Sequence, residues 1–213
     1  MIPAKYRRSE EMEILVLFDS KGGHTYELAK AVAQGIEQVE GVKARIRYPR
    51  ETTPIEVIRS DQAWSEFYDF KIRELQEVTM DDVAETDGLA MGSPTRYGNM
   101  TPTLGNFIES LGPLWSSGVL VGKPAGVFCS TMSMHGGNEM TLISMMIPLM
   151  HLGYIIVPAG YTIPSAGKTT RGGTPYGPTS VSGIGEASLT DDEHAICLAF
   201  GKRLAEVAMK LKG

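Results

Sequence analysis

A short turn near the N-terminus has residue types and spacing that suit a phosphate group. Loop one, as we call it, contains Ser20, Lys21, Gly22, Gly23, His24 and Thr25. Its glycines let the backbone approach a ligand closely, and the hydroxyl groups of Ser20 and Thr25 can donate hydrogen bonds to phosphate oxygens. His24 offers another donor, and Lys21 offers a positive charge either to the phosphate or to solvent. The pattern matches neither the dinucleotide fingerprint nor the P-loop, so by itself it also fits an ordinary capped turn.

The segments on either side place loop one at the start of a helix. Residues 14–18 (Ile-Leu-Val-Leu-Phe) are an apolar run typical of a buried strand. Residues 26–40 follow with Leu28, Val32 and Ile36 on one helical face. The first N–H groups of a helix have no partner within the helix and lie at the positive end of its dipole. The order of strand, glycine turn and helix therefore predicts a phosphate site.

Strands and helices alternate along the rest of the chain, which predicts an α/β fold with a parallel sheet covered on both faces. The further strands are expected at 42–47, 88–92, 125–129 and 154–157. The further helices are expected at 55–78, 102–111, 139–152 and 190–211. Alternating polarity marks 42–47 as an edge strand, and the Gly, Ser, Thr and Pro of 165–188 indicate an irregular excursion. We expect a single domain, 1–213, with a flexible tail at 1–11 and elaborations at 50–80 and 160–188.

Composition narrows the class of protein. The formal net charge of −5 supplies no broad basic face, so we expect no nucleic-acid partner. No apolar run approaches the length that spans a membrane, and the first ten residues lack the apolar core of a signal peptide. A cytoplasmic location is therefore expected. Cys129 and Cys197 have no CxxC partner and are expected to be buried thiols, and the four histidines show no metal-ligand spacing. We expect no metal site.

Two further loops should lie beside loop one, because ligands of doubly wound sheets bind outside the carboxyl ends of the strands. Loop two contains Pro94, Thr95, Arg96, Tyr97, Gly98 and Asn99. Loop three contains Ser130, Thr131, Met132, Ser133, Met134, His135, Gly136 and Gly137. One phosphate site with two loops of planar, apolar and hydrogen-bonding groups fits flavin mononucleotide (FMN). Its phosphate would lie at the helix and its isoalloxazine ring between loops two and three.

A family resemblance becomes specific at loop two. Residues 92–100 (Gly-Ser-Pro-Thr-Arg-Tyr-Gly-Asn-Met) resemble the Gly-Thr-Pro-Thr-Arg-Phe-Gly-Asn-Met segment of the WrbA-type flavoproteins. Residues 171–177 (Arg-Gly-Gly-Thr-Pro-Tyr-Gly), 114–118 (Leu-Trp-Ser-Ser-Gly) and 155–158 (Ile-Ile-Val-Pro) also resemble that family. The similarity runs in register from about residue 13 to the C-terminus. These proteins are flavodoxin-like NAD(P)H:quinone oxidoreductases, first named as tryptophan-repressor-binding proteins.

The resemblance implies a fold, a site and an assembly. The fold would be a flavodoxin-like three-layer sandwich with a five-stranded parallel sheet in the order 2-1-3-4-5. Loop one would hold the FMN phosphate, loop two the isoalloxazine, and loop three the ribityl chain and the ring edge. Trp115 matches a tryptophan near the family's substrate pocket. Tyr97 and Trp115 are aromatic and could stack on a flat substrate, or Trp115 could instead pack in a subunit interface. The family assembles as a homotetramer, a dimer of dimers, and the excursion at 165–188 would help to build it.

The sequence departs from the family at three places. Gly22 stands where the family often has a tyrosine that contacts nicotinamide, and loop three is bulkier and one residue longer. The family's helical histidine aligns with Leu152, one position after His151. One step rotates a helical side chain by about 100°, so we expect His151 to be a core or interface histidine.

The first hypothesis for function is an FMN enzyme that reduces quinones by two electrons. NADH or NADPH would give a hydride to flavin N5, leave, and be replaced by a quinone, and no side chain would act as a nucleophile or obligatory base. Arg96 would place positive charge near the ring or the dinucleotide phosphates, or else point outward. The alternatives are a flavodoxin-type one-electron carrier and a non-catalytic flavin-bound interaction protein.

Overall fold

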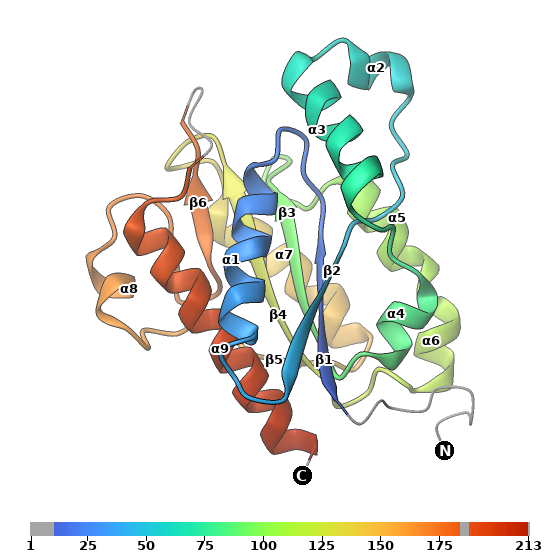
Figure 1. The fold of residues 1–213 in the computed structure, drawn as a ribbon, viewed down its shortest axis with the longest axis vertical. Coiled ribbons are helices and arrows are strands. Elements are labelled where there is room, and N and C mark those ends of the chain that lie inside the picture. The colour runs from blue at the N-terminus through green and yellow to red at the C-terminus, as the bar shows by residue number, and fades with distance from the viewer. Residues whose placement is uncertain (1–10, 184–187, 213) are drawn as a thin grey trace.

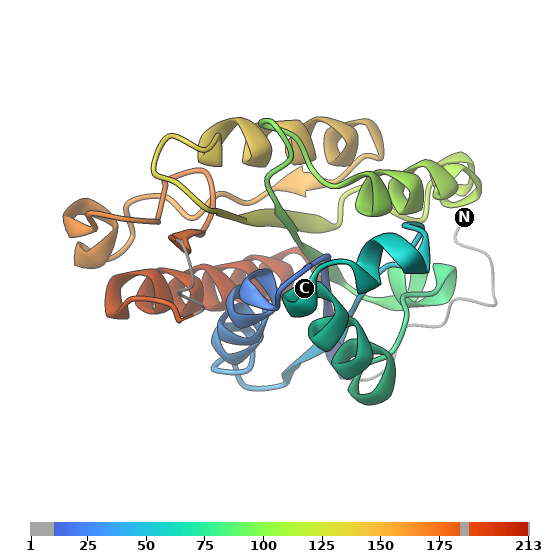
Figure 2. The same cartoon turned by 90° about the horizontal axis from the view of Figure 1, so that it is seen from above.

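The computed structural model describes residues 11–183 and 188–212 and contains a parallel sheet between two layers of helices (Figures 1 and 2). The strands are β1 (Met12–Phe18), β2 (Val42–Arg47), β3 (Gly88–Pro94), β4 (Pro124–Thr131), β5 (Ile155–Ile156) and β6 (Thr179–Val181). The helices of the N-terminal half are α1 (His24–Ile36), α2 (Ile55–Arg59), α3 (Gln62–Glu74), α4 (Met80–Glu85) and α5 (Pro102–Ser110). They are followed by α6 (Gly112–Ser117), α7 (Asn138–His151), α8 (Pro164–Lys168) and α9 (Asp191–Lys212).

The strand order is β2-β1-β3-β4-β5, and every pairing is parallel, which confirms the expected topology and the edge position of β2. β5 pairs with the start of β4 through Pro124 and Ala125. β6 pairs with the end of β4, where Cys129 lies opposite Thr179 and Thr131 opposite Val181. Because β3 occupies the other side of β4, β5 and β6 share one edge.

The apolar run of β1 is continuous because the strand is buried on both faces. Ile14, Val16 and Phe18 pack into a core with α1 and α9, whereas Leu15 and Leu17 pack into a second core with α5 and α7. Figure 2 shows the two helical layers edge-on, with α1 and α9 on one side of the sheet and α5, α6 and α7 on the other. Both expected cysteine thiols are buried.

The predicted helix at 55–78 is wrong in its extent: it is two helices, α2 and α3. The chain leaves α2 at Ser60, and the carboxylate of Asp61 accepts a hydrogen bond from the N–H of Trp64, which starts a new helix. The first helix also ends at Ile36, earlier than the expected residue 40, and residues 80–85 form a helix, α4, that the sequence did not predict. Only the early end of α1 is a matter of element boundaries, which local patterns define least well; the break at Ser60 and the helix α4 are differences in the number of helices.

The excursion at 165–188 is more regular than expected, because it contains most of α8 and all of β6. The pairing of β6 with β4 joins residues about fifty positions apart, and such long-range pairing leaves no local periodicity in the sequence. The expected tail at 1–11 falls almost entirely outside the described residues, as do residues 184–187 of the excursion.

α3 is fastened to the body of the protein by a buried ion pair. The Lys71 ammonium, 1% exposed, lies 3.2 Å from the carboxylate of Glu51, which is 8% exposed. Glu51 also accepts hydrogen bonds from the N–H of Thr53 and from the hydroxyl of Thr103 at the start of α5. This network sets the position of α3, which lies beside loop one (Figure 1).

Candidate functional site

Parts of all three predicted loops line one pocket of about 600 Å³ at the carboxyl end of the sheet. Its lining consists of Ser20, Lys21, Gly22, His24, Thr25, Ala63, Pro94, Thr95, Arg96, Ser130, Thr131, Met132, Ser182 and Gly183. A volume of this size is typical of sites for small molecules and cofactors. The pocket lies where β1, β3 and β4 end, as the doubly wound topology predicts.

Loop one leads into the first turn of α1 through a glycine N-cap. Gly23 is the N-cap residue with a φ of 87°, and as a glycine it has no side chain that could cap the helix. The hydroxyl groups of Thr25 and Ser130 are 2.8 Å apart, which joins loop one to the end of β4. Ser20 is buried and its N–H donates to Asp19 Oδ1. The loop therefore places backbone N–H groups, hydroxyl groups and the positive end of the helix dipole at the pocket, where they can bind an anion.

Two cations line the same pocket. The Lys21 ammonium lies 3.7 Å from the centre of the Trp64 ring, a cation–π contact that fixes the side chain. Partial burial, and then the positive charge of Arg96, lower the pKa of Lys21. Burial also lowers the pKa of Arg96, whose guanidinium remains charged at neutral pH. Among the residues that the structure describes, neither cation forms an ion pair, so both charges favour an anionic ligand.

Thr95 is the centre of loop two. Its N–H donates to the carbonyl of Ser130 at 2.9 Å, and its hydroxyl oxygen accepts from the N–H of Gly98 at 3.2 Å. The Thr141 hydroxyl on α7 lies 2.8 Å from the same oxygen. Tyr97 has a positive φ of 55°, uncommon for a residue other than glycine, and its side chain is fully exposed. Loop two is therefore held rigidly while it presents an aromatic ring to the outside.

Loop three is only partly a loop, because Ser130 and Thr131 belong to β4 and Pro94 of loop two likewise belongs to β3. Gly137 begins α7 with a φ of 92°, and a Cβ there would lie 3.1 Å from Cα of Gly98. Loops two and three therefore touch. Between them lies a shallower pocket of about 430 Å³, lined by Tyr97, Gly98, His135, Gly136, Gly137 and Met140. The remaining residues of the two loops that line neither pocket are Asn99, Ser133 and Met134.

Two residues singled out by the resemblance lie away from this pocket within one chain. Trp115 is 61% exposed on α6, a helix at the other end of the sheet from the pocket (Figure 1). His151 is an exposed residue at the C-terminal end of α7, so the expectation of a core histidine is wrong, while an interface position remains a prediction. The substrate role of Trp115 also stays a prediction, one that requires a second subunit.

Sequence reasoning missed the part of the pocket that comes from outside the three loops. Ala63 belongs to α3, and Ser182 and Gly183 follow β6. A Cβ on Gly22 would meet the Cβ of Ala63 at 3.7 Å, an ordinary contact. The helical periodicity of α3 indicated a packed helix but not where it packs, and Ser182 lay among many small polar residues. Only the three-dimensional arrangement identifies them.

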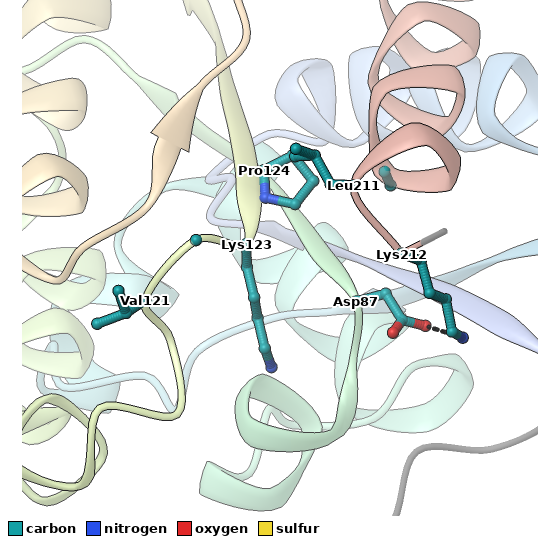
Figure 3. A pocket seen from close by; sticks show the side chains of 8 residues that line it. Asp87, Val121, Lys123, Pro124, Leu211 and Lys212 are labelled. Carbon is teal, nitrogen blue, oxygen red and sulfur yellow. Dashed lines mark hydrogen bonds and ion pairs between the residues drawn. The ribbon is translucent and has the colours of Figure 1, made fainter. Parts of the chain in front are cut away.

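A smaller pocket of about 250 Å³ lies at the opposite end of the sheet (Figure 3). There the Lys212 ammonium is 3.2 Å from Asp87, as the dashed line in Figure 3 marks. The Lys123 ammonium donates to the carbonyls of Val83 and Ala84 at the end of α4. These groups stabilise the ends of β3, α4 and α9, so the pocket at the carboxyl end of the strands is the candidate site.

The donors of the candidate site fit FMN. The first turn of α1, with its glycine N-cap, and the hydroxyl groups around it suit a dianionic phosphate, and Lys21 and Arg96 add positive charge. Loops two and three extend from the phosphate side of the pocket to the exposed ring of Tyr97. No group of three or more potential metal ligands gathers within residues 11–183 and 188–212.

Fold and site together define a flavodoxin-like protein. A WrbA-like flavodoxin from Agrobacterium tumefaciens superposes with a TM-score of 0.62 at 20% identity, covering 94% of this chain and 99% of that one. An archaeal flavodoxin superposes with a TM-score of 0.58 at 20% identity, covering 95% of this chain and 100% of that one. At these identities the likeness shows the fold alone.

Sequence comparison gives the family. The model of the NADPH-dependent FMN reductase family matches residues 12–168, and the chain belongs to this family of oxidoreductases. A protein of Syntrophobacter fumaroxidans named NAD(P)H dehydrogenase (quinone) is 37% identical, with 94% of this chain and 98% of that protein covered. A protein of the same name from Geobacter metallireducens is also 37% identical, with 95% and 100% covered. The predicted family and fold are confirmed.

Proposed function

We propose that the protein is an FMN-dependent NAD(P)H:quinone oxidoreductase that transfers two electrons in a ping-pong reaction. The observation that supports this most is that loops one, two and three line one pocket with phosphate donors, while loops two and three also border a second, open pocket at Tyr97. The names of the curated relatives support the quinone as acceptor. Bound FMN would supply the chemistry, accepting a hydride at N5 and passing two electrons to the quinone.

The chain's own residues would bind the FMN and orient it toward the substrates. The first turn of α1 with Ser20, His24 and Thr25 holds the phosphate. The rigid backbone around Thr95 and the loop 133–137 border the flavin ring. Tyr97, which is fully exposed, offers a flat face on which nicotinamide or a quinone can stack.

The test is direct. The purified protein should be yellow, should bleach when NADH or NADPH is added without air, and should recover its colour when benzoquinone follows. Double-reciprocal plots of the steady-state rate against NAD(P)H concentration, drawn at several fixed quinone concentrations, should give parallel lines, as expected for a ping-pong mechanism. A colourless protein that takes up no added FMN would refute the proposal.

Replacing Arg96 with alanine should weaken FMN or donor binding. The guanidinium lines the pocket without an ion pair among the described residues, so its charge is available to an anion. Loss of one such charge should reduce FMN affinity, or kcat/KM for the donor, about three- to tenfold. Arg59→Ala on α2, whose guanidinium pairs with Asp69 at the surface, is the matched control. Unchanged affinity and unchanged rates of both half-reactions would show that Arg96 acts only through its backbone.

The assembly is proposed to be a homotetramer in the cytoplasm. Apolar side chains on α7 (Met140, Ile147 and Met150) are exposed in the single chain, as is Trp115 on α6. Such faces are typical of subunit interfaces.

No helix in the described part of the chain is long and apolar enough to cross a bilayer. Size-exclusion chromatography with light scattering tests the assembly, and a monomer at micromolar concentration would contradict it.

A further inference from the structure

Glu193 is a fully buried carboxylate at the start of α9. Its Oε2 accepts a hydrogen bond from the N–H of Thr190 at 2.9 Å, and its own N–H donates to the Thr190 hydroxyl at 3.2 Å. This reciprocal pair is the ordinary capping box of a helix. Its Oε1, however, accepts two more hydrogen bonds, from the N–H groups of Gly172 and Val181, both at 3.0 Å. A cap alone needs neither of them.

The two additional donors hold the segment that carries β6. Val181 is the last residue of β6, and the Arg171 guanidinium donates to its carbonyl. Gly172 approaches so closely that a Cβ there would lie 2.1 Å from the carbonyl oxygen of Thr179 and 2.5 Å from Glu193 Oε1. β6 has only three residues and one neighbouring strand, so its pairing with β4 is weak by itself. Glu193 therefore joins the last residue of β6 to Gly172 and to the start of α9, and holds in place a strand that would otherwise be loosely held.

The position of β6 determines one wall of the pocket. Ser182, the next residue, lines the pocket with Gly183, and its N–H donates to the carbonyl of Thr131 at 2.8 Å. Ser180 Oγ lies 2.9 Å from Nε2 of His24, at the start of α1. β6 therefore contacts loop one and loop three at the same time, on the side where the phosphate donors are.

We propose that Glu193 is a positioning residue of the cofactor site, which acts through β6, and that Ser182 is an additional residue facing the phosphate-bearing chain of the flavin nucleotide. This inference rests on the proposed FMN site. Without the carboxylate, the N–H groups of Gly172 and Val181 would be buried with no acceptor. Local release of β6 to solvent is then easier than unfolding of the whole sheet, and the pocket loses the wall that Ser182 forms.

Glu193→Ala tests the proposal directly. In the apo protein, amide hydrogen exchange at Val181 and Ser182 should rise clearly above the wild-type rate. The dissociation constant for FMN, measured by quenching of flavin fluorescence, should increase about tenfold. Glu193→Gln keeps one acceptor oxygen, so its amide exchange rates and its FMN dissociation constant should lie between those of the wild type and those of Glu193→Ala. Wild-type FMN affinity in Glu193→Ala would overturn the proposal.

Asp82 provides a matched control, because it is also a buried capping-box carboxylate but belongs to α4 at the other end of the sheet (Figure 1). Asp82→Ala should lower the melting temperature and leave the FMN dissociation constant within about twofold of wild type. An equal loss of FMN affinity in both variants would mean that Glu193 contributes only general stability, and would overturn the positioning role.

Two milder variants decide the matter if Glu193→Ala does not fold. Ser182→Ala and Ser180→Ala remove single hydroxyl groups and should weaken FMN binding about two- to fivefold with little change in melting temperature. Unchanged affinity in both would overturn the proposal. Failure of the wild-type protein to bind FMN would refute the proposed function instead, and the amide exchange of apo Glu193→Ala would still report whether Glu193 anchors β6.

Discussion

Replacing Lys71 with methionine should destabilise the protein by about 3–5 kcal/mol, the usual effect of removing one partner from a buried ion pair. The ammonium is 1% exposed and lies 3.2 Å from Glu51. It also lies 5.3 Å from the ring centre of Tyr48 and 5.5 Å from that of Tyr68. Methionine restores the apolar contacts of the lysine stem but leaves the Glu51 carboxylate buried without its counter-charge. The free energy of unfolding in urea gives the measurement.

Lys30→Met is the matched control for this experiment. Lys30 and Glu27 form an ion pair at 2.9 Å on α1, with both side chains about 40% exposed. An exposed pair of this kind contributes at most about 0.5 kcal/mol. A similar small effect for both substitutions would show that the Lys71–Glu51 pair is not a major source of stability.

The pH dependence of the Lys71→Met effect follows from Glu51. Burial by itself would raise the pKa of this carboxyl, but hydrogen bonds from Thr53 and the charge of Lys71 outweigh it and hold the pKa below its ordinary value. A carboxyl with a lowered folded-state pKa stabilises the protein above its unfolded-state pKa, and the stabilisation is lost as the pH falls through the folded-state value. The difference in unfolding free energy between wild type and Lys71→Met should therefore shrink in acid. A difference that is constant between pH 7 and about pH 3 would contradict this assignment.

The sheet and loop one could be predicted because their signals are local. The continuous apolar run from Ile14 to Phe18 predicts a strand that is buried on both faces. The four-residue spacing of apolar side chains in α1 predicts the helical face that packs on this strand. Once loop one lies at the carboxyl end of β1, the parallel topology brings loops two and three to the same end. The convergence of three loops is therefore a consequence of strand direction rather than of any residue contact.

The remaining wall of the pocket could not be predicted because it depends on long-range pairing. β6 is three residues among many Gly, Ser and Thr, and it exists because Glu193 and the edge of β4 hold it. α3 contacts loop one and α1 through two aromatic side chains. Phe67 packs on Tyr26, with their ring centres 5.8 Å apart, and the Trp64 ring forms a cation–π contact with the Lys21 ammonium. Sequence periodicity gave the apolar face of α3 but no information on which neighbour the face would meet.

Gly23 has the strictest backbone requirement in loop one. It is the N-cap of α1 with a φ of 87°, and a Cβ there would lie 3.1 Å from Cδ2 of Phe67. A left-handed conformation costs a residue with a side chain about 1–3 kcal/mol. In the apo protein an alanine at this position can relieve the strain by rotating the loop. Binding of FMN would require the loop to return, because only this conformation directs the first N–H groups of α1 at the phosphate.

Gly23→Ala should therefore increase the FMN dissociation constant about 10- to 100-fold, because binding must return the alanine to the left-handed conformation at the cost given above. Its apo melting temperature should change less than its affinity does. Gly22→Ala is the matched control from the same loop: Gly22 has no positive φ, and an added Cβ would make only an ordinary contact with Ala63 at 3.7 Å. It should bind FMN within about threefold of wild type. If the two alanine variants bind FMN equally well, the N-terminus of α1 does not hold the phosphate, and the cofactor must lie elsewhere along the carboxyl end of the sheet.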